Sequence, residues 1–191
     1  MSEQVQNQTM LKPVTNPSDS ELWAWWQTIQ QDPAGRQWFS DAFPKTYADF
    51  VGVLLSGAER CVVFLDGDQV AGGYWLHDMV DDDPDYPPYA WIRGYVDPAY
   101  RGRFMAQAWP VACSIFEQWG YRHLFAATHV NNQRTLACLD KTLKFTRVGD
   151  YPNFCFFDGK PSTCTVYSMY AEDVSLAMRD AKFRSEHLCA A

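Results

Sequence analysis

Apolar residues recur along the chain with two spacings, and the change between them falls near residue 60. Up to that point the spacing is that of helices, with one clear stripe of large side chains: Leu22, Trp25, Trp26 and Ile29. A helix is predicted over 21–31, and a second helical stretch, interrupted by a proline, over 37–42 and 47–55. A short strand over 9–15 precedes them. It is expected at an edge of the sheet, because Pro13 lacks the backbone donor that an inner strand would need.

Beyond residue 60 the apolar runs are short and compact, as in the strands of a sheet. Cys61–Leu65 and Val70–Met79 flank an Asp-Gly turn, which is the strongest short-range signal of a β-hairpin. Further elements are predicted as follows: strands over 89–96, 123–130, 147–157 and 162–170, and helices over 103–119 and 133–144. Pro110 lies inside the first of these helices and is expected to kink or break it.

The resulting order of elements is β-α-α-β-β-β-α-β-α-β-β. A hairpin followed by strand-helix-strand crossovers predicts an α/β fold in which a mixed sheet carries helices on both faces. With 191 residues, of which 47% are hydrophobic, the chain has the composition of one globular domain. We expect a flexible N-terminus over 1–8, the domain over 9–172 and a helical C-terminal appendage over 173–191.

Charge and hydropathy argue against several classes of function. The formal net charge is −7, so the chain is not expected to neutralise a row of phosphates, and no nucleic acid is expected as a partner. Apolar runs stay well below the roughly 18 residues that a membrane span requires, so no membrane partner is expected. The six cysteines form no C-x-x-C pair and are interpreted as reduced thiols, which indicates a cytoplasmic protein. The four histidines show no ligand spacing, and no metal site is expected.

The segment with most chemical content is Val96–Ala108 (VDPAYRGRFMAQA). A predicted strand ends in Val-x-Pro, a short loop follows, and a helix begins at once. Such a turn directs several backbone N–H groups at one point, with the positive end of the helix dipole behind them, which suits a pyrophosphate. Arg101 and Arg103 would add charge-assisted contacts, and Gly102 would let the backbone approach the ligand. The alternative interpretation is a plain strand-loop-helix with solvated arginines.

Together with its flanking segments, this loop resembles the GCN5-related N-acetyltransferases (GNAT). VDPAYRGRFMA is similar to their V-x-P-x-Y-R-G-x-G-x-A signature, and THVNNQRTLACLDKTLKFTRVG to their V-x-x-x-N-x-x-A-x-x-x-Y-x-K-x-G-F segment. The resemblance spans residues 9–172 and implies a GNAT-type fold with acetyl-CoA as cosubstrate, whose pantetheine arm would meet backbone groups of Val96. The cofactor-binding residues that it implies are Val96, Arg101, Gly102, Arg103, Phe104, Met105, Ala106 and Asn132.

Four departures from the family pattern mark the chain as divergent. Phe104 stands where the family has a glycine that lets phosphate lie close to the backbone. Lys144 replaces the glycine of the Gly-Phe pair, with one extra residue in the segment before it. Leu139 falls where many members keep a tyrosine that protonates the leaving thiolate, and Ala90 about where histone-modifying members keep a glutamate base.

Acetyl transfer to an amine requires a deprotonated amine, a polarised thioester carbonyl and a proton for the departing sulfur. A backbone N–H near the end of the strand over 89–96 could polarise the carbonyl. A base is expected from His77, Asp78 or Asp81–Asp83, and an acid from Tyr151 or Tyr95. The acidic segment that begins at Asp78 either attracts a cationic amine or is only a solvated loop.

Two functions of different class remain open. The first is an acyl-CoA-dependent N-acetyltransferase that acts by direct transfer on an amine of a small molecule or protein. The second is a catalytically inactive domain of the same fold with a structural or binding role, for example a phage-encoded virion component, which would then be found in the particle. The retained Arg101, Gly102 and Asn132 favour the first function, and the Phe104 and Leu139 departures favour the second. A protein partner or a homo-oligomer fits either.

Overall fold

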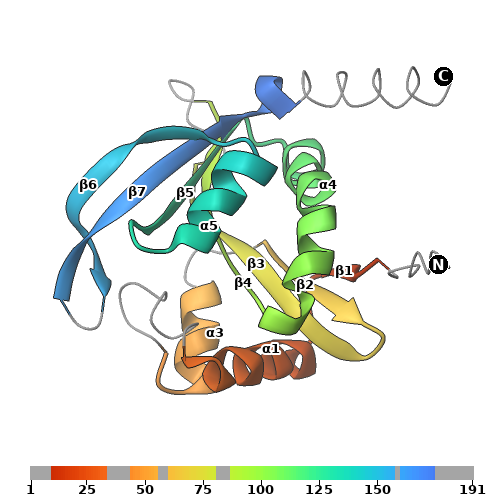
Figure 1. Cartoon of the computed structure of the whole chain (residues 1–191). Coiled ribbons are helices and arrows are strands. Elements are labelled where there is room, and N and C mark those ends of the chain that lie inside the picture. The colour runs from red at the N-terminus through yellow and green to blue at the C-terminus, as the bar shows by residue number, and fades with distance from the viewer. Residues whose placement is uncertain (1–9, 34–43, 56–59, 81–86, 158–159, 175–191) are drawn as a thin grey trace, which may run out of the picture.

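The computed structural model describes residues 10–33, 44–55, 60–80, 87–157 and 160–174 (Figure 1). Its strands are β1 (Lys12–Thr15), β2 (Cys61–Asp66), β3 (Gln69–Val80), β4 (Tyr89–Val96), β5 (His123–His129), β6 (Thr146–Phe157) and β7 (Lys160–Tyr170). Its helices are α1 (Asp19–Gln31), α3 (Tyr47–Leu55), α4 (Arg101–Trp119) and α5 (Gln133–Ala137), with the short turns η1 (Pro98–Tyr100) and η2 (Cys138–Thr142). The predictions for 1–8, for 37–42 and for most of 173–191 lie outside the described residues.

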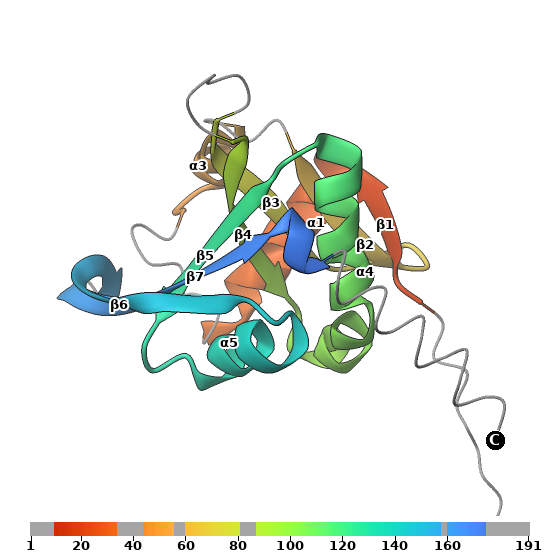
Figure 2. The ribbon, with the colours of Figure 1, turned by 90° about the horizontal axis from the view of Figure 1, so that it is seen from above.

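The strands form one sheet in the order β1-β2-β3-β4-β5-β7-β6. β4 and β5 are parallel, and the other neighbouring pairs are antiparallel. The mixed sheet predicted from the order of elements is thereby confirmed. β1 lies at one edge, as its Pro13 predicts. At the other edge, the outer part of the β6–β7 hairpin extends away from α4 in both views (Figure 1, Figure 2).

Local signals in the sequence account for some element boundaries. Ser18 caps α1, because its hydroxyl accepts from the N–H of Glu21, whose carboxylate accepts from the N–H of Ser18. Gly67 in the β2–β3 turn has a φ of +60°, the left-handed conformation that the predicted hairpin needs. α4 begins at Arg101, slightly earlier than predicted, and continues through Pro110 without a break.

Helices pack on both faces of the sheet, as predicted, and α1 lies beside α3, apart from α4 and α5 (Figure 1). The main core joins α4 and η2 to the sheet and includes Tyr74, Leu76, Ala90, Ile115, Phe116, Leu124, Leu139 and Tyr167. The second core joins α1 and α3 to the opposite face and includes Trp25, Ile29, Phe50, Leu54, Val63, Trp75 and Tyr95. Trp75 thus points away from its neighbours Tyr74 and Leu76, as the alternation of a strand requires.

The predicted helix over 133–144 is only partly α-helical. α5 ends at Ala137 and continues as a π-helical turn at Cys138–Thr142, closed by a hydrogen bond from the Leu143 N–H to the Cys138 carbonyl. A π-helical turn takes one residue more than an α-helical turn, so it accommodates the extra residue in this segment. Lys144 then adopts a φ of +57°, the left-handed conformation that favours the glycine of the family pattern.

The interpretation of the cysteines as reduced thiols is wrong for one pair. Cys155 and Cys164 form a disulfide between β6 and β7, with their Cα atoms 6.1 Å apart. The C-x-x-C rule misses this pair because the hairpin, and not local spacing, brings the two residues together. With this pair oxidised, cysteine usage no longer indicates a cytoplasmic location.

Candidate active site

A wedge-shaped opening separates the two parallel strands of the sheet. β4 pairs with β5 only as far as Trp91 opposite Phe125. Beyond this point β4 stays paired with β3 up to Val96, and β5 stays paired with β7 up to His129. The two strands therefore diverge. We call the opening between them the notch, and its apex is the pair Trp91 and Phe125.

The backbone of β4 directs polar groups into the notch. The N–H of Asp97 donates to the carbonyl of Ala71 at 2.9 Å, so the backbone groups of Asp97 face β3. Because successive residues of an antiparallel strand point their backbone groups to opposite sides, those of Gly94 and Val96 face the notch. The Val96 carbonyl accepts a hydrogen bond from Nε of Arg101 at 3.1 Å. An extended ligand could pair with β4 here as an additional strand would.

The first turn of α4 follows where β4 ends. In the η1 turn between them, the carboxylate of Asp97 accepts from the N–H of Ala99 at 2.7 Å. The N-cap residue of α4, Tyr100, makes no side-chain cap hydrogen bond. The first N–H groups of a helix lack partners within the helix, and the dipole is positive there, so this end favours an anion. The space is open, since a Cβ at Gly102 would meet no atom within 4 Å.

Both arginines of this segment are paired with carboxylates. Arg103 binds Asp66 with both terminal nitrogens, at 2.6 and 2.9 Å, and this hydrogen bonding holds the pKa of the Asp66 carboxyl below its usual value. Arg101 Nη2 lies 3.2 Å from Oδ2 of Asp32, at the end of α1. The same Oδ2 accepts from the Tyr95 hydroxyl at 2.9 Å. The arginines thus hold α4 against the β2–β3 hairpin and α1, and their predicted contact with a pyrophosphate stays a prediction.

Phe104 packs into the protein interior rather than across the start of α4. Its ring lies edge-on to the ring of Phe64 on β2, with centroids 5.1 Å apart, and it packs against the main core. The departure from glycine at this position therefore adds a core contact.

Other residues that the resemblance implies in cofactor binding have structural contacts. The Cys138 thiol donates to Sδ of Met105 at 3.5 Å, which joins η2 to α4. Asn132 caps α5, because its Oδ1 accepts from the N–H of Thr135 at 3.3 Å. Asn132 therefore fixes the start of the helix that follows β5. The side chain of Ala106 lies outside the described residues.

Two candidate catalytic residues lie on the face of the sheet that also carries α1 and α3. A series of ring contacts joins Tyr151 to Phe154 at 5.9 Å, Phe154 to Trp91 at 6.3 Å, and Trp91 to His77 at 6.4 Å between centroids. Tyr151 is 43% exposed. The structure thus brings His77 and Tyr151 to opposite sides of the apex of the notch.

The remaining candidates are placed differently. Tyr95 is buried in the second core, and burial together with its hydrogen bond to Asp32 raises the pKa of its hydroxyl well above the usual value. The side chain of Asp78 and the three aspartates after β3 lie outside the described residues. Leu139 and Ala90 are buried in the main core.

Sequence reasoning missed three residues that shape this site: Asp32, Trp91 and Phe125. The aromatic residues could have been found, because alternation within 89–91 and 123–125 places them on one face of neighbouring strands. Asp32 offers no comparable signal, since its partners Tyr95 and Arg101 are more than sixty positions away in the sequence.

Neither metal ligands nor a membrane span can be recognised in the described parts of the chain. Among those residues, no three His, Cys, Asp or Glu side chains are grouped so that they could hold a metal ion. The helices described there are too short or too polar to cross a membrane.

Comparisons with known proteins identify a family from its sequence model and a fold from solved structures. The family model described as Acetyltransferase (GNAT) family matches residues 20–145. No curated protein sequence matches the chain. The ribosomal-protein-S5-alanine acetyltransferase from Vibrio fischeri is similar in structure, with a TM-score of 0.70, 13% identity, and coverage of 86% of this chain and 95% of that one.

Two further solved structures give the same result. RimJ from Mycobacterium smegmatis, in complex with CoA-disulfide, has a TM-score of 0.69 at 14% identity, and the match covers 85% of this chain and 88% of that one. An acetyltransferase from Salmonella typhimurium that modifies the N-terminal serine of the ribosomal protein L7/L12 has a TM-score of 0.66 at 18% identity, with coverage of 85% and 95%. At these identities the likeness shows the fold.

Proposed function

Because the chain belongs to the acetyltransferase (GNAT) family, we propose that it is an acetyl-CoA-dependent N-acetyltransferase that transfers the acetyl group directly to an amine of a small molecule or protein. The observation that carries this proposal is the notch between β4 and β5, which opens beside the uncapped first turn of α4. The proposed domain is 9–172.

The residues present fit acetyl-CoA, which when bound supplies an activated acetyl thioester. The first N–H groups of α4 would bind the pyrophosphate, in the open space beside Gly102. The backbone groups of Gly94 and Val96 would pair with the amides of the pantetheine arm. Arg101 and Arg103 would reach the phosphates only by exchanging one carboxylate each for a phosphate oxygen.

The chemistry requires the amine nitrogen to attack the carbonyl carbon of the thioester. A C–N bond forms and the C–S bond breaks, the nitrogen loses a proton, and the departing sulfur gains one, so that an amide and the free thiol of CoA result. We assign the base to His77 and the acid to Tyr151, because they flank the apex of the notch on the same face of the sheet. Tyr95 fits less well, because its hydroxyl already donates to Asp32.

One observation favours the alternative of a catalytically inactive domain with a structural or binding role. Both arginines expected at the pyrophosphate are held by carboxylates, Arg101 by Asp32 and Arg103 by Asp66. If these pairs persist in the presence of ligand, only backbone groups and the helix dipole remain to bind the phosphates. The alternative therefore predicts that acetyl-CoA does not bind.

Calorimetric titration with acetyl-CoA distinguishes the N-acetyltransferase from the inactive domain. A variant at the start of α4 then tests whether the cofactor binds there. Gly102→Asp places a carboxylate in the open space at the positive end of the helix, where it suits the helix but repels a pyrophosphate. Gly52→Asp is the matched control, because Gly52 in α3 also has open space around it and the change in charge is the same. We expect binding to the parent chain and to Gly52→Asp, and its loss in Gly102→Asp. Absence of binding to the parent chain would contradict the proposal.

A further inference from the structure

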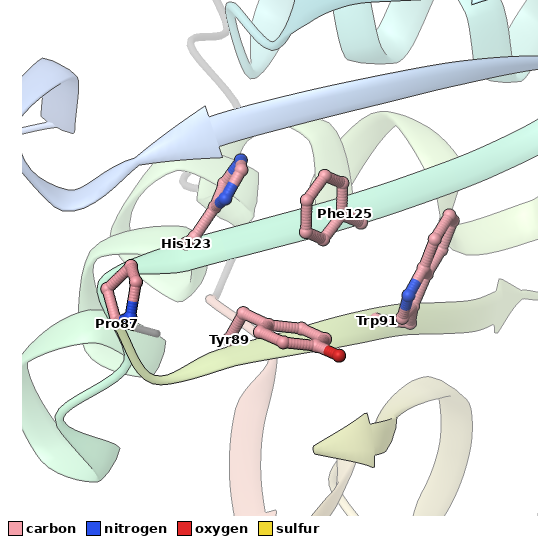
Figure 3. A pocket seen from close by; sticks show the side chains of 5 residues that line it. All are labelled: Pro87, Tyr89, Trp91, His123 and Phe125. Carbon is pink, nitrogen blue, oxygen red and sulfur yellow. The ribbon is translucent and has the colours of Figure 1, made fainter. Parts of the chain in front are cut away.

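A cavity lined by aromatic side chains lies beside the apex of the notch. It measures about 340 Å³ and is lined by Pro87, Tyr89, Trp91, His123 and Phe125. Figure 3 shows these side chains, with those of β4 and β5 gathered over the same side of the two strands. We call this cavity the aromatic pocket. Its volume lies at the lower end of the range found for small-molecule sites and suits a compact ligand.

The aromatic pocket opens on the face of the sheet that carries α1 and α3. Ala90 on β4 and Leu124 on β5 point into the main core, on the other face. Their neighbours Tyr89, Trp91 and Phe125 therefore point the opposite way, since side chains alternate along a strand. This is also the face on which His77 and Tyr151 flank the apex.

Trp91 and Phe125 belong both to the aromatic pocket and to the apex of the notch. From Val96 to Trp91 β4 spans five residues, about 17 Å at the rise of an extended strand. A ligand arm that enters at α4 and follows β4 therefore runs toward these two rings. A second ligand seated in the aromatic pocket would present its nearest atoms to the same point.

The lining favours a flat, apolar body. Trp91 stacks on Phe125 with centroids 5.1 Å apart and planes inclined by 26°, and Tyr89 stands edge-on to Phe125 at 5.9 Å. Among the described residues that line the pocket, none carries an acidic or permanently basic side chain. Such rings add stacking and edge contacts for an aromatic ligand beyond what apolar burial alone gives. Among the described lining residues, an extended polyamine would find no carboxylate partner.

His123 lines the aromatic pocket with an imidazole ring. Its ring lies 4.0 Å from the rings of both Phe125 and Tyr170, and its Nε2 is buried without a hydrogen-bond partner among the described residues. A buried polar atom without a partner is uncommon. Burial also lowers the pKa of His123, which favours the neutral ring and avoids repulsion of a cationic amine.

We infer that the acceptor is a small molecule with an aromatic ring and a primary amine, in which the ring occupies the aromatic pocket and the amine reaches the apex of the notch. This inference rests on the proposed acetyl transfer. It excludes the terminal amine of a protein as the preferred acceptor, because a pocket of this size and lining selects a compact flat body.

The test is a comparison of binding for matched amines, measured by calorimetry with the parent chain in the presence and absence of saturating CoA. 2-Phenylethylamine should bind about fivefold tighter than 2-cyclohexylethylamine, which has the same number of carbon and nitrogen atoms and the same charge but no aromatic ring. Spermidine and a short peptide with a free N-terminus should bind at least about tenfold more weakly than 2-phenylethylamine. Equal affinity for the two ring amines, or tighter binding of the peptide or of spermidine, would overturn the inference.

Two variants locate the binding. Phe125→Leu and Trp91→Leu keep an apolar side chain in the sheet but remove a ring from the pocket, and each should weaken 2-phenylethylamine about fivefold. Trp23→Leu is the control, because Trp23 is 46% exposed on α1 and does not line the pocket. Equal weakening in all three variants would contradict the assignment.

The outcomes for the two proposals are distinguishable. If acetyl-CoA binds and amines are acetylated without preference for the aromatic ring, the inference fails and the proposed function stands. If acetyl-CoA does not bind, the proposed function fails, and the titrations without CoA still decide whether the aromatic pocket selects aromatic amines.

Discussion

The ion pair between Arg101 and Asp32 should oppose CoA binding, and Asp32→Asn should therefore strengthen it. In the free protein Arg101 donates to both Asp32 and the Val96 carbonyl, so its guanidinium is directed toward the end of α1 and the strand end. To contact a phosphate it must give up the carboxylate. Asparagine retains an oxygen that can accept from Tyr95 but no longer carries the charge that holds Arg101.

The size of the effect follows from the exposure of the pair. The side chain of Arg101 is 33% exposed and that of Asp32 13%, and one nitrogen–oxygen contact of 3.2 Å joins them. The free-energy contribution of a part-buried pair with one such contact lies between that of an exposed ion pair and that of a charge-assisted hydrogen bond, at about 1 kcal/mol. Removal of the charge should therefore lower the Kd for CoA about fivefold.

Asp150→Asn is the control for this experiment, because it changes the net charge equally. Asp150 pairs with Arg147 on β6, at 2.7 Å. Calorimetric titration with CoA should show tighter binding for Asp32→Asn and little change for Asp150→Asn. Unfolding in urea should confirm that both variants are folded. Unchanged or weaker CoA binding in folded Asp32→Asn would mean that the ion pair does not oppose CoA binding.

Four further outcomes are expected. Lys144→Gly should raise the free energy of unfolding by about 1 kcal/mol, because Lys144 has a φ of +57°, and an unchanged urea midpoint would contradict this. Phe104→Gly should lower that free energy by about 3 kcal/mol without tightening CoA binding, since the ring packs against the main core, whereas tighter binding would mean that the ring obstructs the site. Serine at both Cys155 and Cys164, which are nine positions apart, should cost about 2.5 kcal/mol, and a reductant should lower the Tm of the parent chain but not that of the variant. Because burial lowers the pKa of His123, the unfolded chain binds a proton near pH 6 more readily than the folded chain. The free energy of unfolding should therefore fall as the pH drops from about 7 through the pKa of His123 in the unfolded chain toward its lower pKa in the folded chain. His123→Gln should show a smaller decline over this range.

Elements with strong local signals were predicted correctly. β4 has the predicted bounds, Tyr89–Val96, and the Asp-Gly turn joins β2 to β3. These signals depend on short-range sequence alone, namely on alternation and on a glycine with a left-handed conformation. The sequence predicted the order of elements along the chain but not the place of β7 between β5 and β6 in the sheet.

Features that depend on contacts between distant segments were not predictable. The pairing of Arg103 with Asp66 was not expected, because the end of β2 lies beside Arg103 only after β2 and β3 pack near α4. The Cys155–Cys164 disulfide depends on the register of β6 with β7. The direction of the Phe104 ring depends likewise on the position of β2. The sequence shows that these positions hold an arginine, two cysteines and a phenylalanine, but the residue that each one contacts depends on the tertiary structure.

Amide hydrogen exchange, measured by NMR with and without CoA, shows directly whether CoA lies along β4 and at the start of α4. In the free protein the N–H of Val96 faces the notch, and the first N–H groups of α4, including that of Gly102, have no partner within the helix. Saturating CoA should slow exchange at both places, because the pantetheine arm is proposed to lie along β4 and the pyrophosphate at the start of α4. Unchanged exchange at Val96 and Gly102 under saturation, with protection elsewhere, would contradict this placement.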